Sequence, residues 1–385
     1  MKKCLLFVVF ILSSLSATPY PPLPLQYEQN KTIIPFNTSF PLIGEHSIIG
    51  RQMLAGIENY LREYKHFTSE VEDSSQKYIL KLVKNNKEGE DKGLDELTAM
   101  LPASPLFLGL IGTELFTSLL PNISNHRMAL LFPLEGDSYL RNQKLDNVIY
   151  FRPSYEKELR VLAKYALNNK HKNSIAIFHE ASNWGNRLLA TLKALLKEYN
   201  ITPAVTASYA QGTVDVEQAL QIISKATPNA VFCCANPRPA YAFISNALNV
   251  GLHECLFLGL SQLAVIQKLL KTSRGLDIAV TAVVPNAKTS KLPIIQEYKR
   301  AMKTFLSFRD DSPFYLEAFI NVALFEYCLK KIKSPITIEA IMKQFESFNH
   351  INFKGLDLSF DPSDRSLSSA LWINPGVDRE WISCE

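Results

Sequence analysis

The segment IAIFHEASNWGNRLLATLKALLKEYN places an indole and several polar groups between two patterned stretches. An apolar run at 175–178 stops abruptly, and a long amphipathic pattern begins at 186. In an open α/β sheet, a loop at the carboxyl end of a strand faces the ligand crevice. The indole of Trp184 offers a large contact area at little entropic cost and can stack on an aromatic or cationic group. Glu180 and Asn183 are candidate polar neighbours of a ligand; the alternative is an indole packed on its own helix.

Two other apolar runs end in loops with hydrogen-bonding groups. After PLFLGLI, Gly112 and Thr113 open a helix, where a hydroxyl and free backbone N–H groups suit a carboxylate or another anion. Thr113 equally suits an N-cap role on its own helix, and the two roles can coexist. Further on, FPLEG brings Glu135 and Gly136 to a strand end. The Glu135 carboxylate there either binds an amine or guanidinium group or faces solvent.

The elements that must position these loops alternate between strand and helix patterns. Buried, non-alternating strands such as SIAIFHE and AVFCCA precede amphipathic helices, which is typical of parallel sheets flanked by helices. Right-handed crossovers place the loops that follow such strands along one edge. Two similar runs, 45–130 and 156–260, and three extended connections predict an α/β protein with two lobes joined by a three-stranded hinge. A cleft between lobes is a preferred ligand location.

The length and composition agree with this organisation. A chain of 385 residues is long for one domain and suits two lobes of ordinary size. Its 47% hydrophobic and 20% charged residues are typical of a globular protein with ample apolar material for cores. The formal charge is only +4, and no basic stripe with interleaved aromatics appears. Nucleic acid is therefore not an expected partner.

The first residues, MKKCLLFVVFILSSLSA, have the build of a secretory signal peptide. Two lysines precede an apolar run at 5–12, and small polar residues follow it. That run is shorter than the roughly 20 residues that a membrane anchor needs. We therefore expect residues 1–17 to be removed and the mature protein to be exported.

The five cysteines beyond this segment have no metal-like spacing. Cys233 and Cys234 lie in an apolar run, so their side chains are expected to point to opposite faces of a strand. Most of the cysteines are expected to be small core residues. A disulfide from Cys233 or Cys234 to Cys255 stays open, because export permits it.

The motifs of common enzyme classes do not occur in this sequence. There is no G-x-S-x-G elbow, P-loop or H-E-x-x-H motif. The HE pair at 179–180 is isolated and lacks the spacing of metal ligands. We therefore expect no enzymatic activity, no cofactor and no metal site.

Seven segments follow one another in an order that points to a family: PLIGEHSIIGRQMLAGIENYL, GLIGTELFTSLLP, YFRPSYEKE, IAIFHEASNWGNRLLATLKALLKE, ASYAQGTVDVEQAL, AVVPN and GLDLSFDPSDRSLSSALWI. Over nearly all of the mature chain, the sequence resembles the type I periplasmic binding proteins. The resemblance is strongest to the substrate-binding subunits of ABC importers related to the leucine/isoleucine/valine-binding protein. It implies two Rossmann-like lobes, at 27–152 plus 285–352 and at 153–280 plus 360–385. The implied hinge crossings lie near 151–153, 281–285 and 355–361.

The resemblance also implies roles for loop residues. Relatives have a TGxxxxxG pattern after the first strand, with a small or hydroxyl residue and an aromatic near the ligand; here Ser47 and Ile48 occupy that loop. Relatives often carry a tyrosine at the first hinge crossing, which implies ligand contact for Tyr155. Arg152 beside it pairs either with a ligand acid or, more commonly, with a carboxylate across the lobes. In the branched-chain amino acid binders an aromatic before a glycine closes over the ligand, and NWG matches this pattern at Trp184.

One position departs from the family pattern. Amino-acid binders carry an acidic residue just after the strand that corresponds to CLFLGL, where it pairs with the ligand ammonium. This chain has Ser261 and Gln262 there, with Ser261 as the expected ligand contact. A buried ammonium without a charge partner is costly. Either Glu135 or Glu180 takes over this role, or the ligand is an amide, a nucleoside or an organic acid.

The resemblance implies a monomeric periplasmic protein that captures a small polar ligand, such as an amino acid or an amide, by hinge closure. It would then deliver this ligand to an ABC transporter permease in the inner membrane. The alternative is a ligand-sensing protein of the same fold that docks to a signalling receptor. A degenerate member that does not take part in transport is a third possibility.

Overall fold

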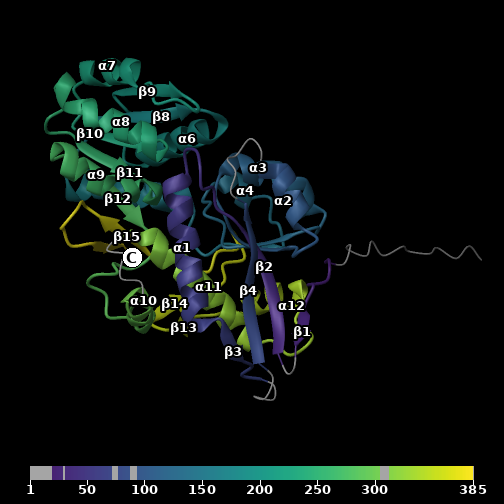
Figure 1. Ribbon diagram of the computed structural model, residues 1–385. Coiled ribbons are helices and arrows are strands. Elements are labelled where there is room, and N and C mark those ends of the chain that lie inside the picture. The colour runs from purple at the N-terminus through teal and green to yellow at the C-terminus, as the bar shows by residue number, and fades with distance from the viewer. Residues whose placement is uncertain (1–19, 29–30, 72–76, 87–92, 304–311, 385) are drawn as a thin grey trace, which may run out of the picture.

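The computed structural model describes residues 20–28, 31–71, 77–86, 93–303 and 312–384, so the predicted signal peptide lies outside the described residues. Two sheets, each of seven strands and each flanked by helices, form two lobes (Figure 1). The predicted α/β architecture is therefore confirmed.

The first sheet has the strand order β3-β4-β2-β5-β6-β7, and β1 pairs with the outer part of β2. The pairs from β4 through β7 are parallel, whereas β1 and β3 are antiparallel to their neighbours. Its strands are β1 (Gln26–Glu28), β2 (Lys31–Ser39), β3 (His66–Thr68), β4 (Lys77–Asn86), β5 (Leu106–Leu110), β6 (Ala129–Leu131) and β7 (Val148–Ile149). The helices of this lobe are α1 (Ser47–Tyr64), α2 (Gly93–Met100), α3 (Thr113–Ser124), α4 (Ser138–Arg141), α10 (Pro293–Lys303), α11 (Pro313–Lys330) and α12 (Ile338–Glu346).

The second sheet has the order β16-β15-β12-β11-β10-β8-β9, with β15 and β16 antiparallel and the rest parallel. Its strands are β8 (Ile175–Ala181), β9 (Val205–Ala210), β10 (Ala230–Cys234), β11 (Leu256–Gly259), β12 (Ala279–Ala282), β15 (Leu371–Asn374) and β16 (Ile382–Cys384). Its helices are α5 (Tyr155–Lys164) with a π-helical turn η1 (Tyr165–Asn169), α6 (Asn183–Glu198), α7 (Glu217–Lys225), α8 (Pro237–Ala247) with η2 (Leu248–Val250), and η3 (Ser261–Leu263) with α9 (Ala264–Arg274).

Both faces of the second sheet are covered, as the apolar strands predict. Cys233 on β10 belongs to the core on one face and Cys234 to the core on the other, which confirms their predicted opposite orientation. Cys233, Cys234 and Cys255 are free thiols, so the disulfide that the sequence left open is not formed.

Helix α11 is the centre of the first lobe's core. Fifteen of its residues are buried, and its apolar side chains point in all directions. It packs along α1, as Figure 1 shows. Within the described part of the chain, no helix has the length and apolarity that crossing a membrane requires.

The chain passes between the two sheets after β7, after β12, and between the hairpin β13 (Ile351–Phe353)–β14 (Leu356–Leu358) and β15. The first and third passages are bonded to each other. The backbone N–H of Tyr150 donates to the Arg365 carbonyl at 2.9 Å, and the N–H of Leu367 donates back to Tyr150 at 2.9 Å. The N–H of Ser368 donates to the Phe151 carbonyl at 3.0 Å.

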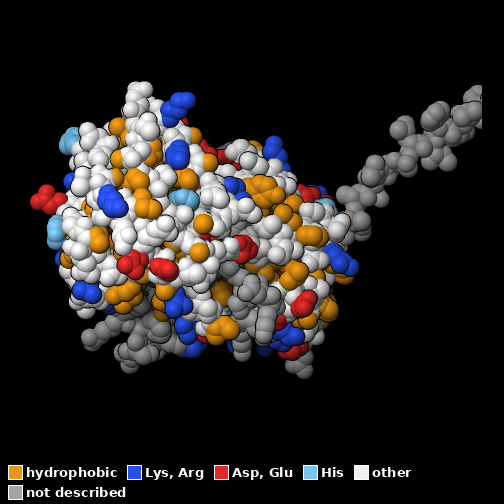
Figure 2. All heavy atoms as spheres, turned by 90° about the horizontal axis from the view of Figure 1, so that it is seen from above, with side chains coloured by type: hydrophobic (Ala, Val, Ile, Leu, Met, Phe, Trp, Pro, Cys, Tyr) orange, Lys and Arg blue, Asp and Glu red, His pale blue; other side chains and the backbone are white. Residues whose placement is uncertain are grey.

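On the face in Figure 2, acidic and basic side chains are scattered among neutral and apolar ones. That face has no continuous basic region of the kind that nucleic acid requires.

Candidate functional site

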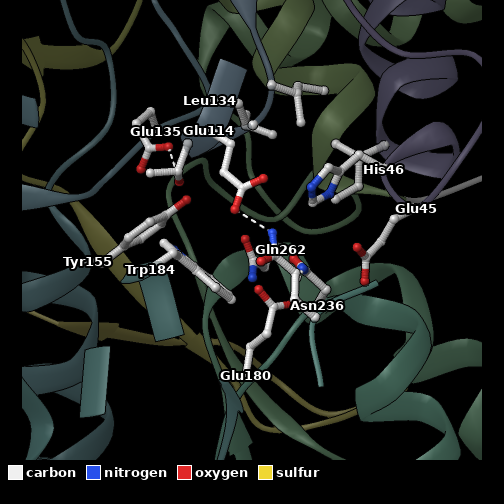
Figure 3. A pocket seen from close by; sticks show the side chains of 15 residues that line it. Glu45, His46, Glu114, Leu134, Glu135, Tyr155, Glu180, Trp184, Asn236 and Gln262 are labelled. Carbon is white, nitrogen blue, oxygen red and sulfur yellow. Dashed lines mark hydrogen bonds between the residues drawn. The ribbon is translucent and has the colours of Figure 1, made fainter. Parts of the chain in front are cut away.

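A cavity of about 50 Å³ lies between the two lobes, where the carboxyl ends of both sheets face each other (Figure 3). Its walls come from the loops after β2, β5 and β6 on one side, and from the start of α5 and the loops after β8, β9, β10 and β11 on the other. This is the location that open α/β sheets favour for a ligand. Six of the predicted site residues line it: Gly112, Thr113, Glu135, Tyr155, Glu180 and Trp184.

Glu135 lies at the end of β6 with its carboxylate fully engaged. Thr113 Oγ1, at the start of α3, donates to Glu135 Oε2 at 2.5 Å. The backbone N–H groups of Gly136 and Asp137 each donate to Oε1 at 2.8 Å. Burial raises the pKa of Glu135, and these hydrogen bonds oppose the rise. Thr113 therefore donates to a carboxylate, and that carboxylate belongs to the protein itself.

Tyr155 is held at the start of α5 against the Glu135 loop. Its backbone N–H donates to the Gly136 carbonyl at 2.7 Å, and its ring is 5% exposed. A Cβ at Gly136 would lie 2.5 Å from the Tyr155 ring, so this close approach requires glycine. Burial, followed by the charge of Glu135, raises the pKa of the Tyr155 phenol, which stays neutral.

Trp184 lies in the first turn of α6, whose N-cap is Ser182. The Ser182 hydroxyl accepts the N–H of Gly185 at 3.1 Å. A Cβ at Gly185 would lie 2.1 Å from the Glu180 carbonyl oxygen, so glycine lets α6 begin directly against the end of β8. Trp184 is 7% exposed, packs into the core of its own lobe and also lines the cavity. Its Nε1 has no hydrogen-bond partner within the described part of the chain.

Glu180, at the end of β8, is 3% exposed and points into the cavity from the second lobe (Figure 3). Its Oε2 accepts from the Tyr209 hydroxyl at 2.8 Å and from Asn236 Nδ2 at 2.9 Å. Burial and then the charge of Glu180 raise the pKa of Tyr209, and the Glu45 carboxylate of the first lobe adds to the rise. Carboxylates of both lobes therefore lie near the same tyrosine.

Four predicted contacts do not line the cavity. Ser47 instead accepts a hydrogen bond from the guanidinium of Arg51 at 3.1 Å, and Ile48 faces outward with 39% of its surface exposed. Gly136 lies beneath the Tyr155 ring. Ser261 is turned toward the lobe junction, and its neighbour Gln262 lines the cavity in its place.

The lobe junction is a buried charge network around Arg152. Arg152 Nε and Nη2 donate to the two carboxylate oxygens of Glu317 on α11 at 3.0 and 2.7 Å. Its Nη1 donates to Ser261 Oγ at 3.2 Å and lies 3.9 Å from Glu158 on α5. Glu158 also accepts from the backbone N–H of Ser261 at 2.8 Å and from the hydroxyl of Thr281. The interlobe ion pair that the sequence favoured for Arg152 is present.

Two further contacts join the lobes at the cavity's edge. Asp137, the N-cap of α4, accepts from Arg187 on α6 through Nε at 2.7 Å and Nη2 at 2.5 Å. Gln211 Nε2, after β9, donates to Glu114 on α3, as the dashed line from Glu114 in Figure 3 shows. The lobes are therefore in contact across the cleft.

The cavity is acidic. Four glutamates line it: Glu45, Glu114, Glu135 and Glu180. Among the described residues around it, none is lysine or arginine, and His46 is the one basic side chain. No group of His, Cys, Asp or Glu within the described ranges is arranged to hold a metal ion.

Some residues that line the cavity were not predicted from the sequence, although they lie in loops that follow predicted strands. Glu45 and His46 lie in the same loop after the first strand, two positions before Ser47 and Ile48. Gln211 directly follows β9 and Asn236 comes two residues after the end of β10, so the expectation that loops after strands face the cleft points to both.

Comparison with known proteins assigns the chain to a class. Residues 105–375 match the family model described as periplasmic binding protein, and the chain belongs to that family. Its structure is similar to that of a possible leucine/isoleucine/valine-binding protein from Rhodopirellula baltica SH 1, with a TM-score of 0.78 and 23% identity, covering 92% of this chain and 96% of that one. No curated protein sequence matches the chain.

Two solved relatives contain ligands. The branched-chain amino acid transporter substrate binding protein of Streptococcus pneumoniae in complex with isoleucine has a TM-score of 0.76 and 13% identity, covering 91% of this chain and 99% of that one. A solute binding protein of an ABC transporter from R. palustris in complex with 4-hydroxybenzoate has a TM-score of 0.76 and 13% identity, covering 92% and 96%. At these identities the likeness establishes the fold.

Proposed function

We propose that this chain is an exported solute-binding protein that captures a small ligand between its lobes and delivers it to an ABC transporter permease. The observation that carries the proposal is the interlobe cavity, whose walls are strand-end loops of both lobes. A ligand there touches both halves at once, and so favours the closed state by its differential affinity. The signal-peptide pattern at residues 1–17 supports a periplasmic location.

The moving parts in this proposal are the two predicted lobes, at 27–152 plus 285–352 and at 153–280 plus 360–385. They rotate about the three chain passages. The Arg152 network lies at the first passage and takes partners from both lobes, so it keeps the base of the cleft fixed while the rim opens. The rim contacts between Arg187 and Asp137 and between Gln211 and Glu114 form on closure.

We further propose that Trp184, Tyr155 and Glu180 contact the ligand directly. Trp184 and Tyr155 supply apolar and aromatic surface, and Glu180 supplies a buried acceptor. Cavities with a few convergent polar groups among aromatic side chains are typical of small-molecule sites. Gln262, Asn236 and Gln211 add neutral hydrogen-bonding groups from the second lobe.

Thermal-shift screening of the mature chain tests this function. The library contains amino acids, amides, amines, nucleosides and organic acids. A ligand at 100 times its Kd stabilises the native state by about 2.7 kcal/mol and raises the melting temperature. A hit that also reduces the radius of gyration in solution scattering supports capture by closure. A library without any hit contradicts the proposal, and co-purification with a receptor in place of permease subunits favours sensing.

A further inference from the structure

If the cavity binds a ligand as proposed, the charges around it indicate which charge that ligand carries. Glu45, Glu114 and Glu135 come from the first lobe and Glu180 from the second, so closure brings acidic groups of both lobes together. Like charges in a partly dehydrated space repel one another. No lysine or arginine is among the described residues that line the cavity. A cation between the lobes would remove this repulsion and would have a carboxylate on each side.

Three donors that would suit a ligand carboxylate already bind a carboxylate of the protein. Thr113 Oγ1 and the backbone N–H groups of Gly136 and Asp137 all donate to Glu135. An incoming carboxylate would have to displace the Glu135 side chain or lie beside it, and burying such a like-charge pair is costly.

The second lobe offers what a cation with N–H groups needs. The hydrogen bonds from Tyr209 and Asn236 to the Glu180 carboxylate both end on Oε2, and none of the described side chains donates to Oε1. Trp184 and Tyr155 line the same cavity, and aromatic faces attract cations. The Nε1 of the 93%-buried Trp184 is also without a partner among the described residues, an unsatisfied donor beside the space that a ligand fills. The N–H groups of a cationic ligand satisfy Glu180 Oε1, and Trp184 Nε1 needs a neutral acceptor, such as a hydroxyl oxygen, on the same molecule.

The size of the cavity sets a limit on the ligand. A volume of about 50 Å³ holds roughly three to five water-sized groups, at about 10–15 Å³ for each. The small volume favours a compact ligand, such as one with a planar guanidinium or a short alkylammonium group.

We propose that the cavity binds a compact organic cation with N–H donors, of the alkylammonium, amidinium or guanidinium type, that carries a neutral hydrogen-bond acceptor and no carboxylate. The inference rests on the proposed function. The inference goes beyond the proposed function because it states the charge that the bound molecule must carry.

Calorimetry with matched probes tests the charge requirement. Guanidinium and urea have nearly the same shape and differ in charge, as do ethylammonium and ethanol. Each is titrated at low millimolar concentration, far below the molar range in which guanidinium unfolds proteins. We expect at least one cation to bind ten times more tightly than its neutral partner, which corresponds to about 1.4 kcal/mol. Leucine and benzoate complete the panel and are expected not to bind.

Variants test the residues. Glu180→Gln keeps the shape and an acceptor for Tyr209 and Asn236 but removes the charge, so it should weaken cation binding at least tenfold. Glu254→Gln is the matched control, because Glu254 is an exposed glutamate of the same lobe and its loss changes the net charge equally. If Glu180→Gln does not fold, Glu45→Gln removes a cavity charge from the opposite lobe, with the same expected direction.

The outcomes separate this inference from the function on which it rests. Binding of urea, leucine or benzoate without binding of the cations overturns the inference and leaves a solute-binding protein. Equal loss of affinity in Glu180→Gln and Glu254→Gln overturns it as well, since the effect would then come from net charge. If the protein binds none of these probes and no compound of the wider library, both the inference and the proposed function are overturned.

Discussion

Removing the Arg152 side chain should be among the most destabilising single changes in this protein. Arg152 is 1% exposed and bonds both carboxylate oxygens of Glu317, which is itself 2% exposed. Its loss leaves Glu317 buried without a counter-charge, and Glu158 loses its positive neighbour. Breaking a buried pair in this way costs about 3–5 kcal/mol. We therefore expect Arg152→Ala to lower the free energy of unfolding by that amount.

The assay is urea unfolding of the ligand-free protein, followed by circular dichroism. Arg160→Ala is the matched control, because Arg160 pairs with Glu198 on the surface, with side chains 46% and 52% exposed. Such a pair contributes about 0–1 kcal/mol. The double variant Arg152→Met/Glu317→Leu also replaces the Glu317 carboxylate by an apolar group and should recover part of the loss, because Glu317 is then no longer a buried charge without its partner. A loss in Arg152→Ala no larger than that in Arg160→Ala would refute this reasoning.

Three more outcomes are expected. Trp184→Ala should weaken ligand binding at least tenfold, about 1.4 kcal/mol, whereas unchanged affinity in calorimetry would remove the indole from the binding site. Because burial raises the pKa of Glu135 above its ordinary value of 4.5, its contribution to stability is complete below pH 4.5 and declines as pH rises through the native pKa. Glu135→Gln should flatten this part of the stability profile in denaturation measured from pH 4 upward, and an unchanged slope would contradict the assignment. Arg187→Ala removes the rim contact to Asp137 and should increase the radius of gyration of the ligand-free protein in solution scattering; an identical radius would show that this contact does not hold the lobes together.

The strand-and-helix alternation made the architecture predictable, because each buried strand has a distinct composition and ends in a loop. Helix α11 was not recognised. Its apolar residues face all directions, so it has no amphipathic period to detect. The short strands β1, β3 and β16 were missed because three residues cannot show an alternating pattern.

Within the site, the sequence indicated the loops more reliably than the residues. Thr113 and Trp184 sit in the first turn of a helix directly after a strand, where position alone aims a side chain toward the cleft. In the loop after the first strand, the resemblance to the family's TGxxxxxG pattern selected Ser47 and Ile48. The first turn of α1 directs these two side chains to Arg51 and to solvent, and this rotation depends on packing that the local sequence does not encode.

The backbone hydrogen bonds between the first and third passages restrict how the two lobes can move relative to each other. Tyr150 and Phe151 form a narrow two-stranded ribbon with residues 365–368, and a ribbon bends out of its plane far more readily than it shears along its length. We therefore expect the two lobes to open by a hinge rotation, without sliding past each other. Each loop at the cleft would then contact the same loop of the other lobe every time the lobes close.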